Sequence, residues 1–309
     1  MQTSMQPSSQ NSVLHTDGHK ADGTMHPIQR TNSEHSIGVI LVKSGKLSPE
    51  KTEAVLNLQK KKNLRFGDAA IKLGLVSADD IRFALARQYH YPYLLQGDGT
   101  VADELVAAYQ PFSVQVEAMR DLRSQLMARW FKAAQPHKTL AFVSPGVGEG
   151  RSYLAANMAV MFSQLGERTL LIDGDMRYPR QHQLFNIDNQ AGLSSILSGR
   201  SNATSIQHIE SFSDLSVLTA GPTPPNPQEL LGRPMFSSLM TYVAQEFDVV
   251  ILDTPAASKY ADAAIISMQS HGALIITRQN ATRLGKTQQL ATGLEELGVE
   301  MVGAVLNNY

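Results

Sequence analysis

The sequence contains no cysteine among its 309 residues, which excludes disulfide bonds and thiolate metal sites and fits a reducing cytoplasm. No apolar run reaches about 18 residues, so we expect no transmembrane segment. The N-terminus lacks the charged and apolar regions of a secretory signal. An excess of one charge is also missing, because the formal net charge is −1, so nothing indicates a nucleic-acid partner or an anionic membrane. Any role at a membrane is expected to come through a partner.

Changes in residue pattern divide the chain into four predicted parts. Residues 1–33 are polar and lack apolar periodicity, so they are predicted to be a disordered tail. Residues 34–95 are predicted to form a small all-α repeat domain, and residues 96–112 a linker with one short helix. Residues 113–309 alternate between helical patterns and apolar runs at 140–143, 169–172, 215–219, 249–252, 273–277 and 302–306. This alternation predicts an α/β domain, a mainly parallel sheet with helices on both faces and ligands at the carboxyl ends of its strands.

The small domain contains an internal repeat. Residues 36–59 align with residues 65–88, and each copy has the pattern of a short helix, a glycine turn, a serine N-cap and an amphipathic helix. The predicted N-caps are Ser48 and Ser77. One copy alone buries too little apolar surface to be stable, so the two copies are expected to pack together.

The stretch SPGVGEGRSY, residues 144–153, predicts a phosphate-binding loop that runs into a helix. Its glycines let backbone N–H groups turn inward, and the helix N-terminus adds free N–H groups and the positive end of its dipole. The loop is unusual in having Pro145 at the first glycine position and Arg151 at the lysine position. Arginine keeps its charge and binds phosphate oxygens well, so nucleotide binding is expected to survive. A glycine-rich turn without a ligand is the alternative. The expected nucleotide-binding residues are Gly146, Gly148, Glu149, Gly150, Arg151, Ser152 and Tyr153.

Carboxylates follow two of the strand-like runs. Asp173 and Asp175 come after one run, and Asp253 ends another. Three carboxylates around one glycine loop repel one another unless a cation lies among them. We therefore predict a Mg²⁺ site made by Ser152 and the three aspartates, with Asp173 as the proton acceptor or a metal ligand. The predicted catalytic set is Asp173, Asp175 and Arg151. In the alternative, each aspartate merely caps a loop.

These motifs together resemble the bacterial tyrosine kinases (BY-kinases) that control polysaccharide chain length. The resemblance rests on residues 144–152, on the D-x-D-x-R pattern within 170–177 and on residues 249–253, and GPTPPNPQELL at 221–231 is similar to the same family. It covers about 113–309. It implies a P-loop, cytoplasmic tyrosine kinase that uses ATP and Mg²⁺ and regulates exopolysaccharide synthesis. It also implies a separate membrane polysaccharide co-polymerase that recruits and activates the kinase at the inner face of the plasma membrane.

The same resemblance implies self-assembly. Glu117, Arg120 and Arg123 match the E-x-x-R-x-x-R pattern through which BY-kinases form rings, so a homo-oligomer is expected. These residues share one face of the predicted helix. An ordinary solvated stripe of charges is the alternative.

Two other families provide alternatives. The MinD and ParA ATPases share the expected fold, but their signature lysine corresponds here to Gly146. This difference argues against membership of those families. A nucleotide-dependent scaffold or ATPase switch of their type, which phosphorylates nothing, is the second hypothesis. The repeat looks like the MshEN domain of secretion ATPases, which binds cyclic di-GMP, although Ser36 stands where that family begins its first unit with arginine. Ligand binding and a structural or docking role both stay open. The candidate ligand contacts are Gln59, Arg65, Gly67 and Gln88.

The chain ends in VLNNY, whereas BY-kinases end in a tail with several tyrosines. Tyr309 is therefore the candidate phosphoacceptor. An extended chain gains at most about 3.3–3.6 Å per residue, so two or three frayed residues reach only about 10 Å. We expect weak or absent phosphorylation at Tyr309 and expect another protein, or an internal tyrosine such as Tyr260, to be the acceptor.

Overall fold

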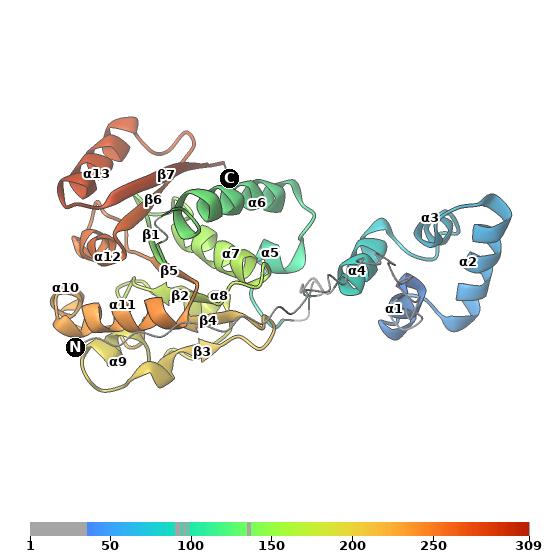
Figure 1. The fold of residues 1–309 in the computed structure, drawn as a ribbon, viewed down its shortest axis with the longest axis horizontal. Coiled ribbons are helices and arrows are strands. Elements are labelled where there is room, and N and C mark those ends of the chain that lie inside the picture. Colours follow the sequence, from blue (N-terminus) through green and yellow to red (C-terminus); the bar gives the residue numbers. More distant parts are fainter. Residues whose placement is uncertain (1–35, 90–93, 95–96, 98, 135–136, 309) are drawn as a thin grey trace, which may run out of the picture.

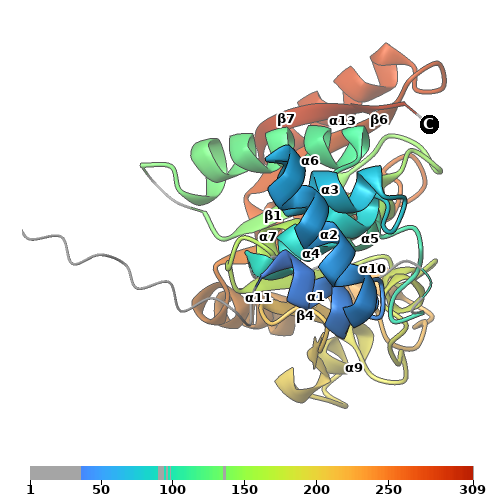
Figure 2. The same ribbon diagram turned by 90° about the vertical axis from the view of Figure 1, so that its right-hand side faces the viewer.

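The computed structural model describes residues 36–89, 94, 97, 99–134 and 137–308. The predicted tail, residues 1–33, and Tyr309 lie outside these residues. Four helices near the N-terminus form a unit apart from the α/β domain (Figure 1), on the side where α5 (Val106–Tyr109) and α7 (Arg151–Ser163) lie (Figure 2). Among the described residues, none of the helices combines the length and the apolar content needed to cross a bilayer.

The helical unit consists of two similar helix pairs. The pairs are α1 (Ile37–Lys43) with α2 (Pro49–Lys62), and α3 (Phe66–Lys72) with α4 (Ala78–Gln88). As predicted, Ser48 and Ser77 cap the longer helix of each pair, and Ser77 forms a reciprocal capping box with Asp80. Both pairs contribute to one small core, so each covers apolar surface of the other. That core includes Leu41, Leu47, Val55, Ala69, Ala70, Val76 and Ala84.

A seven-stranded sheet forms the centre of the α/β domain, in the order β3-β4-β2-β5-β1-β6-β7. All neighbouring strands are parallel except β3 and β4, which confirms the predicted mainly parallel sheet. The strands are β1 (Thr139–Val143), β2 (Thr169–Asp173), β3 (Gln207–His208), β4 (Leu215–Leu218), β5 (Val249–Asp253), β6 (Gly272–Arg278) and β7 (Glu300–Asn307). Only β3 was not predicted, because two residues carry no periodic pattern.

Helices cover both faces of the sheet. Successive side chains of a strand point to opposite faces, so Val249 and Ile251 of β5 pack in one core while Val250 and Leu252 pack in the other. The first core also contains residues of α5, α7, α6 (Val114–Leu126), its π-helical continuation Met127–Phe131, and α8 (Gln181–Leu184). The second core contains residues of α9 (Leu193–Leu197), α10 (Pro227–Leu231), α11 (Pro234–Glu246), α12 (Asp262–Ser270) and α13 (Leu284–Glu296). A short 3₁₀ helix, Ala203–Ser205, precedes β3.

The strand order places the predicted motifs next to one another. Strands β2, β5 and β1 are adjacent, and the glycine loop follows β1. Asp173 of β2 is the register partner of Asp253 of β5. On its other side, Asp253 is the register partner of Phe142 of β1. The two carboxylates and the loop therefore meet at the carboxyl edge of the sheet, where parallel α/β folds bind their ligands.

The contact between Trp130 and Gly272 gives a test of the packing. The indole is 1% exposed, and its Nε1–H donates to the Thr139 carbonyl at 2.9 Å. A Cβ atom at Gly272 would lie 2.3 Å from the indole Cζ2. We predict that Gly272→Ala lowers the free energy of unfolding by about 1–3 kcal/mol in urea denaturation, because overpacking strains a rigid core. Gly293→Ala is the matched control, since its Cβ meets nothing within 4 Å. Equal urea midpoints for Gly272→Ala and the parent would contradict this packing.

Candidate active site

The glycine loop is held in shape by its own side chains and backbone angles. Gly148 and Gly150 have φ values of 73° and 86°, which favour glycine. The Glu149 carboxylate accepts a hydrogen bond from the Gly146 N–H at 2.8 Å and one from the Thr282 hydroxyl. Gly150 is the N-cap of α7. The loop thus leads directly into the free N–H groups of a helix N-terminus, the arrangement that binds phosphate.

Arg151 points inward from the first residue of α7. Its Nε donates to Asp253 Oδ1 at 3.2 Å, and its Nη1 donates to Ser144 Oγ at 2.5 Å. Its Nη2 lies 3.7 Å from Asp175 Oδ2, and the side chain is only 10% exposed. The guanidinium therefore occupies the position among the carboxylates where a cation was expected. In the part of the chain that the structure describes, no three His, Cys, Asp or Glu side chains are grouped to hold a metal ion. The predicted Mg²⁺ site of Ser152 and the three aspartates therefore stays a prediction, with Arg151 as the cation next to Asp253 and Asp175 in this structure.

Asp173 and Asp175 have different environments although only one residue separates them. Asp173 is fully buried, and its oxygens accept backbone N–H bonds from Asp175, Arg180 and Gln181 at 2.9–3.2 Å. Burial, followed by the neighbouring charge of Asp253, raises the pKa of Asp173 well above its ordinary value. Burial also raises the pKa of Asp175. Asp175 lines the cavity described below whereas Asp173 does not, so the residue predicted as the proton acceptor lies beneath the surface.

Gln181 connects the loop helix to the acidic strand end. Its Nε2 donates to the Ser152 carbonyl at 3.2 Å and to Asp253 Oδ2 at 2.8 Å. The side chain is fully buried, and its Oε1 accepts no hydrogen bond from any described residue. A buried acceptor without a donor is rare in proteins, so this carbonyl oxygen is suited to a cation or a cation-bound water. Sequence analysis did not identify Gln181, because this residue stands at no recognisable spacing from the acidic motif.

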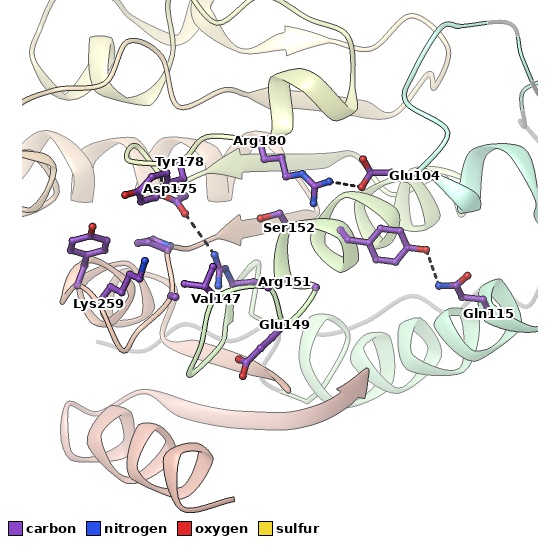
Figure 3. A pocket seen from close by; sticks show the side chains of 16 residues that line it. Glu104, Gln115, Val147, Glu149, Arg151, Ser152, Asp175, Tyr178, Arg180 and Lys259 are labelled. Atoms are coloured by element: carbon purple, nitrogen blue, oxygen red, sulfur yellow. Dashed lines mark hydrogen bonds and ion pairs between the residues drawn. The ribbon is translucent and has the colours of Figure 1, made fainter. Parts of the chain in front are cut away.

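A cavity of about 660 Å³ opens over the loop (Figure 3). Gly148, Glu149, Gly150, Arg151, Ser152 and Tyr153 line it, as does Asp175, so the structure brings most of the predicted nucleotide contacts together. Gly146 is not among the lining residues. Tyr260, which the sequence analysis named as a possible acceptor, also lines the cavity. Five further polar lining residues were not singled out from the sequence: Glu104, Gln115, Tyr178, Arg180 and Lys259.

Two tyrosines form one wall of this cavity. Tyr178 is 67% exposed, and its backbone N–H donates to Asp175 Oδ1 at 2.9 Å. A hydrogen bond with Tyr178 raises the pKa of Tyr260. The Tyr260 ring lies 3.9 Å from the guanidinium carbon of Arg177, which is fixed by a bidentate ion pair with Asp262. Phenol hydroxyls and the Asp175 carboxylate therefore lie along the same wall.

The predicted assembly residues make contacts within the chain. Arg120 pairs with Glu117 and donates to the Pro111 carbonyl, while Arg123 donates to the Met161 carbonyl of α7 at 2.9 Å. The Glu117 side chain is 58% exposed, against 20% for Arg120. Of the three, Glu117 therefore presents the most surface for a contact with another subunit.

The predicted cyclic di-GMP contacts are spread over the helical unit. Gln59 lies in α2, Gly67 is buried within α3, and Arg65 is the N-cap residue of α3. Gln88 lines an open groove that Ser36 and Gly38 also line. Most of the groove's other lining residues are apolar: Ile37, Val39, Val42, Pro49, Leu56 and Phe66. The structure thus brings only Gln88 of the four residues to this groove.

The similarity to known proteins is strongest among kinases. The chain is 32% identical over 203 residues to tyrosine-protein kinase YwqD of Bacillus subtilis, covering 66% of this chain and 85% of the relative. It is 31% identical over 205 residues to tyrosine-protein kinase wzc of Salmonella typhimurium, of which it covers only 28%. No protein-family model matches the chain.

Solved structures agree with these relatives. The kinase domain of the Escherichia coli tyrosine kinase ETK superposes with a TM-score of 0.63 at 30% identity, over 66% of this chain and 79% of that domain. The cell division ATPase MinD of Pyrococcus furiosus superposes with a TM-score of 0.50 at 24% identity, over 56% of this chain and 72% of that one. The second match shows a shared fold and no more.

The position of Arg151 predicts a stability effect in the absence of nucleotide. Arg151→Ala removes the counter-ion of Asp253 and Asp175, so we expect it to lower the free energy of unfolding by about 3 kcal/mol, the effect of breaking a buried ion pair. Arg168→Ala is the control, because Arg168 is 56% exposed and pairs with Asp248, and such pairs contribute about 1 kcal/mol or less. Urea denaturation measures both. A loss in Arg151→Ala no larger than in Arg168→Ala would show that the guanidinium is not the counter-ion.

Proposed function

The chain belongs to the bacterial tyrosine-protein kinases, and from this we propose that it transfers the terminal phosphoryl group of ATP to tyrosines of another protein during exopolysaccharide synthesis. The observation that carries the proposal is the shared cavity. The first residues of α7, Asp175, Tyr178 and Tyr260 all line it. Phosphoryl transfer needs mainly positioning and charge stabilisation, and these groups supply both.

The donor groups suit Mg²⁺, which favours carboxylate and hydroxyl oxygens. Ser152, Asp175 and Asp253 would hold the ion, and the unsatisfied Oε1 of the buried Gln181 fits a nearby cation or its bound water. Bound with ATP, Mg²⁺ supplies charge neutralisation for the transferring phosphoryl group. Arg151 contacts one oxygen of Asp253 and one of Asp175, so the ion would share these two carboxylates with the guanidinium.

Asp175 is our candidate for the proton acceptor. It lines the cavity, it accepts a hydrogen bond from the Tyr178 backbone N–H, and burial raises its pKa, the direction that favours a proton acceptor. Asp173 is assigned a positioning role, because its carboxylate holds the backbone N–H groups of Arg180 and Gln181 in place.

The partner is proposed from family membership and from the resemblance described above. We propose a membrane polysaccharide co-polymerase, a separate chain that recruits this cytoplasmic kinase to the inner face of the plasma membrane.

A switch of the MinD type is the weaker candidate, because the similarity to MinD supports the fold alone. For the helical unit, cyclic di-GMP remains the ligand that its repeat suggests. Its largely apolar groove favours a docking role instead, because Lys43 is the single cation among the described lining residues and a ligand with two phosphates calls for several.

Kinase activity is tested with labelled ATP, Mg²⁺ and the cytoplasmic fragment of a candidate co-polymerase. We predict phosphotyrosine on the fragment or on Tyr178 or Tyr260, and little on Tyr309, as read by mass spectrometry. Asp175→Asn should lower the rate about 100-fold or more, the typical contribution of a general base. Asp188→Asn, an exposed carboxylate outside the cavity, should leave it unchanged. Hydrolysis of ATP without phosphotyrosine on any protein would overturn the kinase proposal in favour of the switch.

Assembly is tested at Glu117. We predict that Glu117→Ala lowers the mass measured by light scattering at a given concentration, because this carboxylate is the most exposed member of the E-x-x-R-x-x-R set. Asp121→Ala, an exposed carboxylate on the same helix, is the control. If both variants keep the parent's mass over a range of concentrations, the set is a solvated stripe.

A further inference from the structure

The cavity is lined by three cations that differ in their freedom to move. Arg151 is one, and its contacts with Asp253, Asp175 and Ser144 are buried. Moving it onto a phosphate would leave two carboxylates without their counter-ion, which proteins avoid. The loop arginine is therefore poorly placed to be the main cation for the phosphates. Lys259 lies beside the Tyr178 ring, 5.9 Å from its centre, on the wall that the two tyrosines form. The third cation is Arg180.

Arg180 combines a fixed backbone with an exposed side chain. Its backbone N–H donates to the buried carboxylate of Asp173 at 3.0 Å. Its guanidinium reaches over Ser152 towards Glu104 (Figure 3), with Nη2 at 2.5 Å from Glu104 Oε2. The two side chains are 43% and 48% exposed. Exposed ion pairs contribute little to stability, so this guanidinium can change partners at small cost.

Glu104 is held at the cavity by the linker and the loop helix. Its carbonyl accepts a hydrogen bond from Asn157 Nδ2 at 3.1 Å, and Asn157 Oδ1 accepts one from the Ala107 N–H at 2.9 Å. Asn157 is fully buried in α7. The linker backbone is thus fastened to the helix that begins at the loop, which keeps the Glu104 backbone at the cavity. Arg180 therefore has an anionic partner within the chain.

We propose that Arg180 is the exchangeable phosphate-binding residue of this site and that Glu104 is the anion it leaves when a nucleotide binds. The inference rests on the proposed function, since it requires nucleotide in the cavity. A guanidinium binds phosphate through two N–H groups, and phosphate carries more negative charge than one carboxylate. Phosphates in the cavity therefore compete successfully for Arg180, whereas Arg151 keeps its buried contact with Asp253.

The test measures the Kd of a fluorescent ATP analogue with Mg²⁺ for the full chain. Arg180→Ala should weaken binding by roughly 10- to 100-fold, as expected for a lost charge-assisted contact, and Arg180→Lys should lie between. Glu104→Gln should bind about 2- to 5-fold more tightly, because it frees the guanidinium from an exposed pair. Adding Glu104→Gln to Arg180→Ala should bring no gain. Arg200→Ala, an exposed arginine outside the cavity, is the matched control.

The outcomes separate this inference from the proposed function. If the parent binds and Arg180→Ala binds within about twofold of it, Arg180 is not the phosphate-binding cation. If Glu104→Gln helps equally in the presence and absence of Arg180, the exchange between the two is refuted. A parent chain that binds no nucleotide overturns the proposed function and this inference with it. Thermal unfolding of Arg180→Ala serves as a folding check, because the backbone bond to Asp173 does not need the side chain.

Discussion

The ion contacts of Arg151 with Asp253 and Asp175 hold the carboxyl edge of this sheet together. The register of β2 and β5 sets Asp173 directly beside Asp253, and parallel pairing leaves no freedom to move the two strand ends apart. Two carboxylates in a buried position destabilise the fold unless a positive charge or protons compensate. The raised pKa of Asp173 and the guanidinium next to Asp253 are the two forms of compensation in this structure.

The surrounding contacts depend on that arrangement. Since Arg151 is the first residue of α7, its contacts fix where the helix begins and therefore where the loop N–H groups point. Gln181 links the same helix to Asp253, and Asn157 links it to the linker that carries Glu104. The cavity is thus bordered by segments far apart in sequence, two of which are fastened to this helix. A loop lysine could neutralise one carboxylate as a point charge, whereas the planar guanidinium contacts several groups at once.

The sequence predicted the parts of the site that regular structure determines. Six of the strands were identified as apolar runs that alternate with helical patterns along the chain, because buried parallel strands are continuously apolar. The topology then predicted that the motifs at the ends of these strands lie together. Two features of the site could not be predicted from the sequence. Asp173 and Asp175 look alike in sequence, yet the last strand residue is enclosed by the sheet while the residue two further on reaches the cavity. Arg180 and Glu104 are brought together only by tertiary packing of the linker, for which no periodic pattern exists.

The hydrogen-exchange rate of the Arg151 Nε–H, measured by NMR on arginine-labelled protein without nucleotide, tests the central ion contact most directly. A buried N–H that donates to Asp253 exchanges slowly, because exchange requires an opening of the structure. We predict that this N–H exchanges far more slowly than that of the exposed Arg200, and that Asp253→Asn speeds it up. Exchange of Arg151 at the rate of Arg200 would contradict the account, since it would place the guanidinium in solvent rather than among the carboxylates.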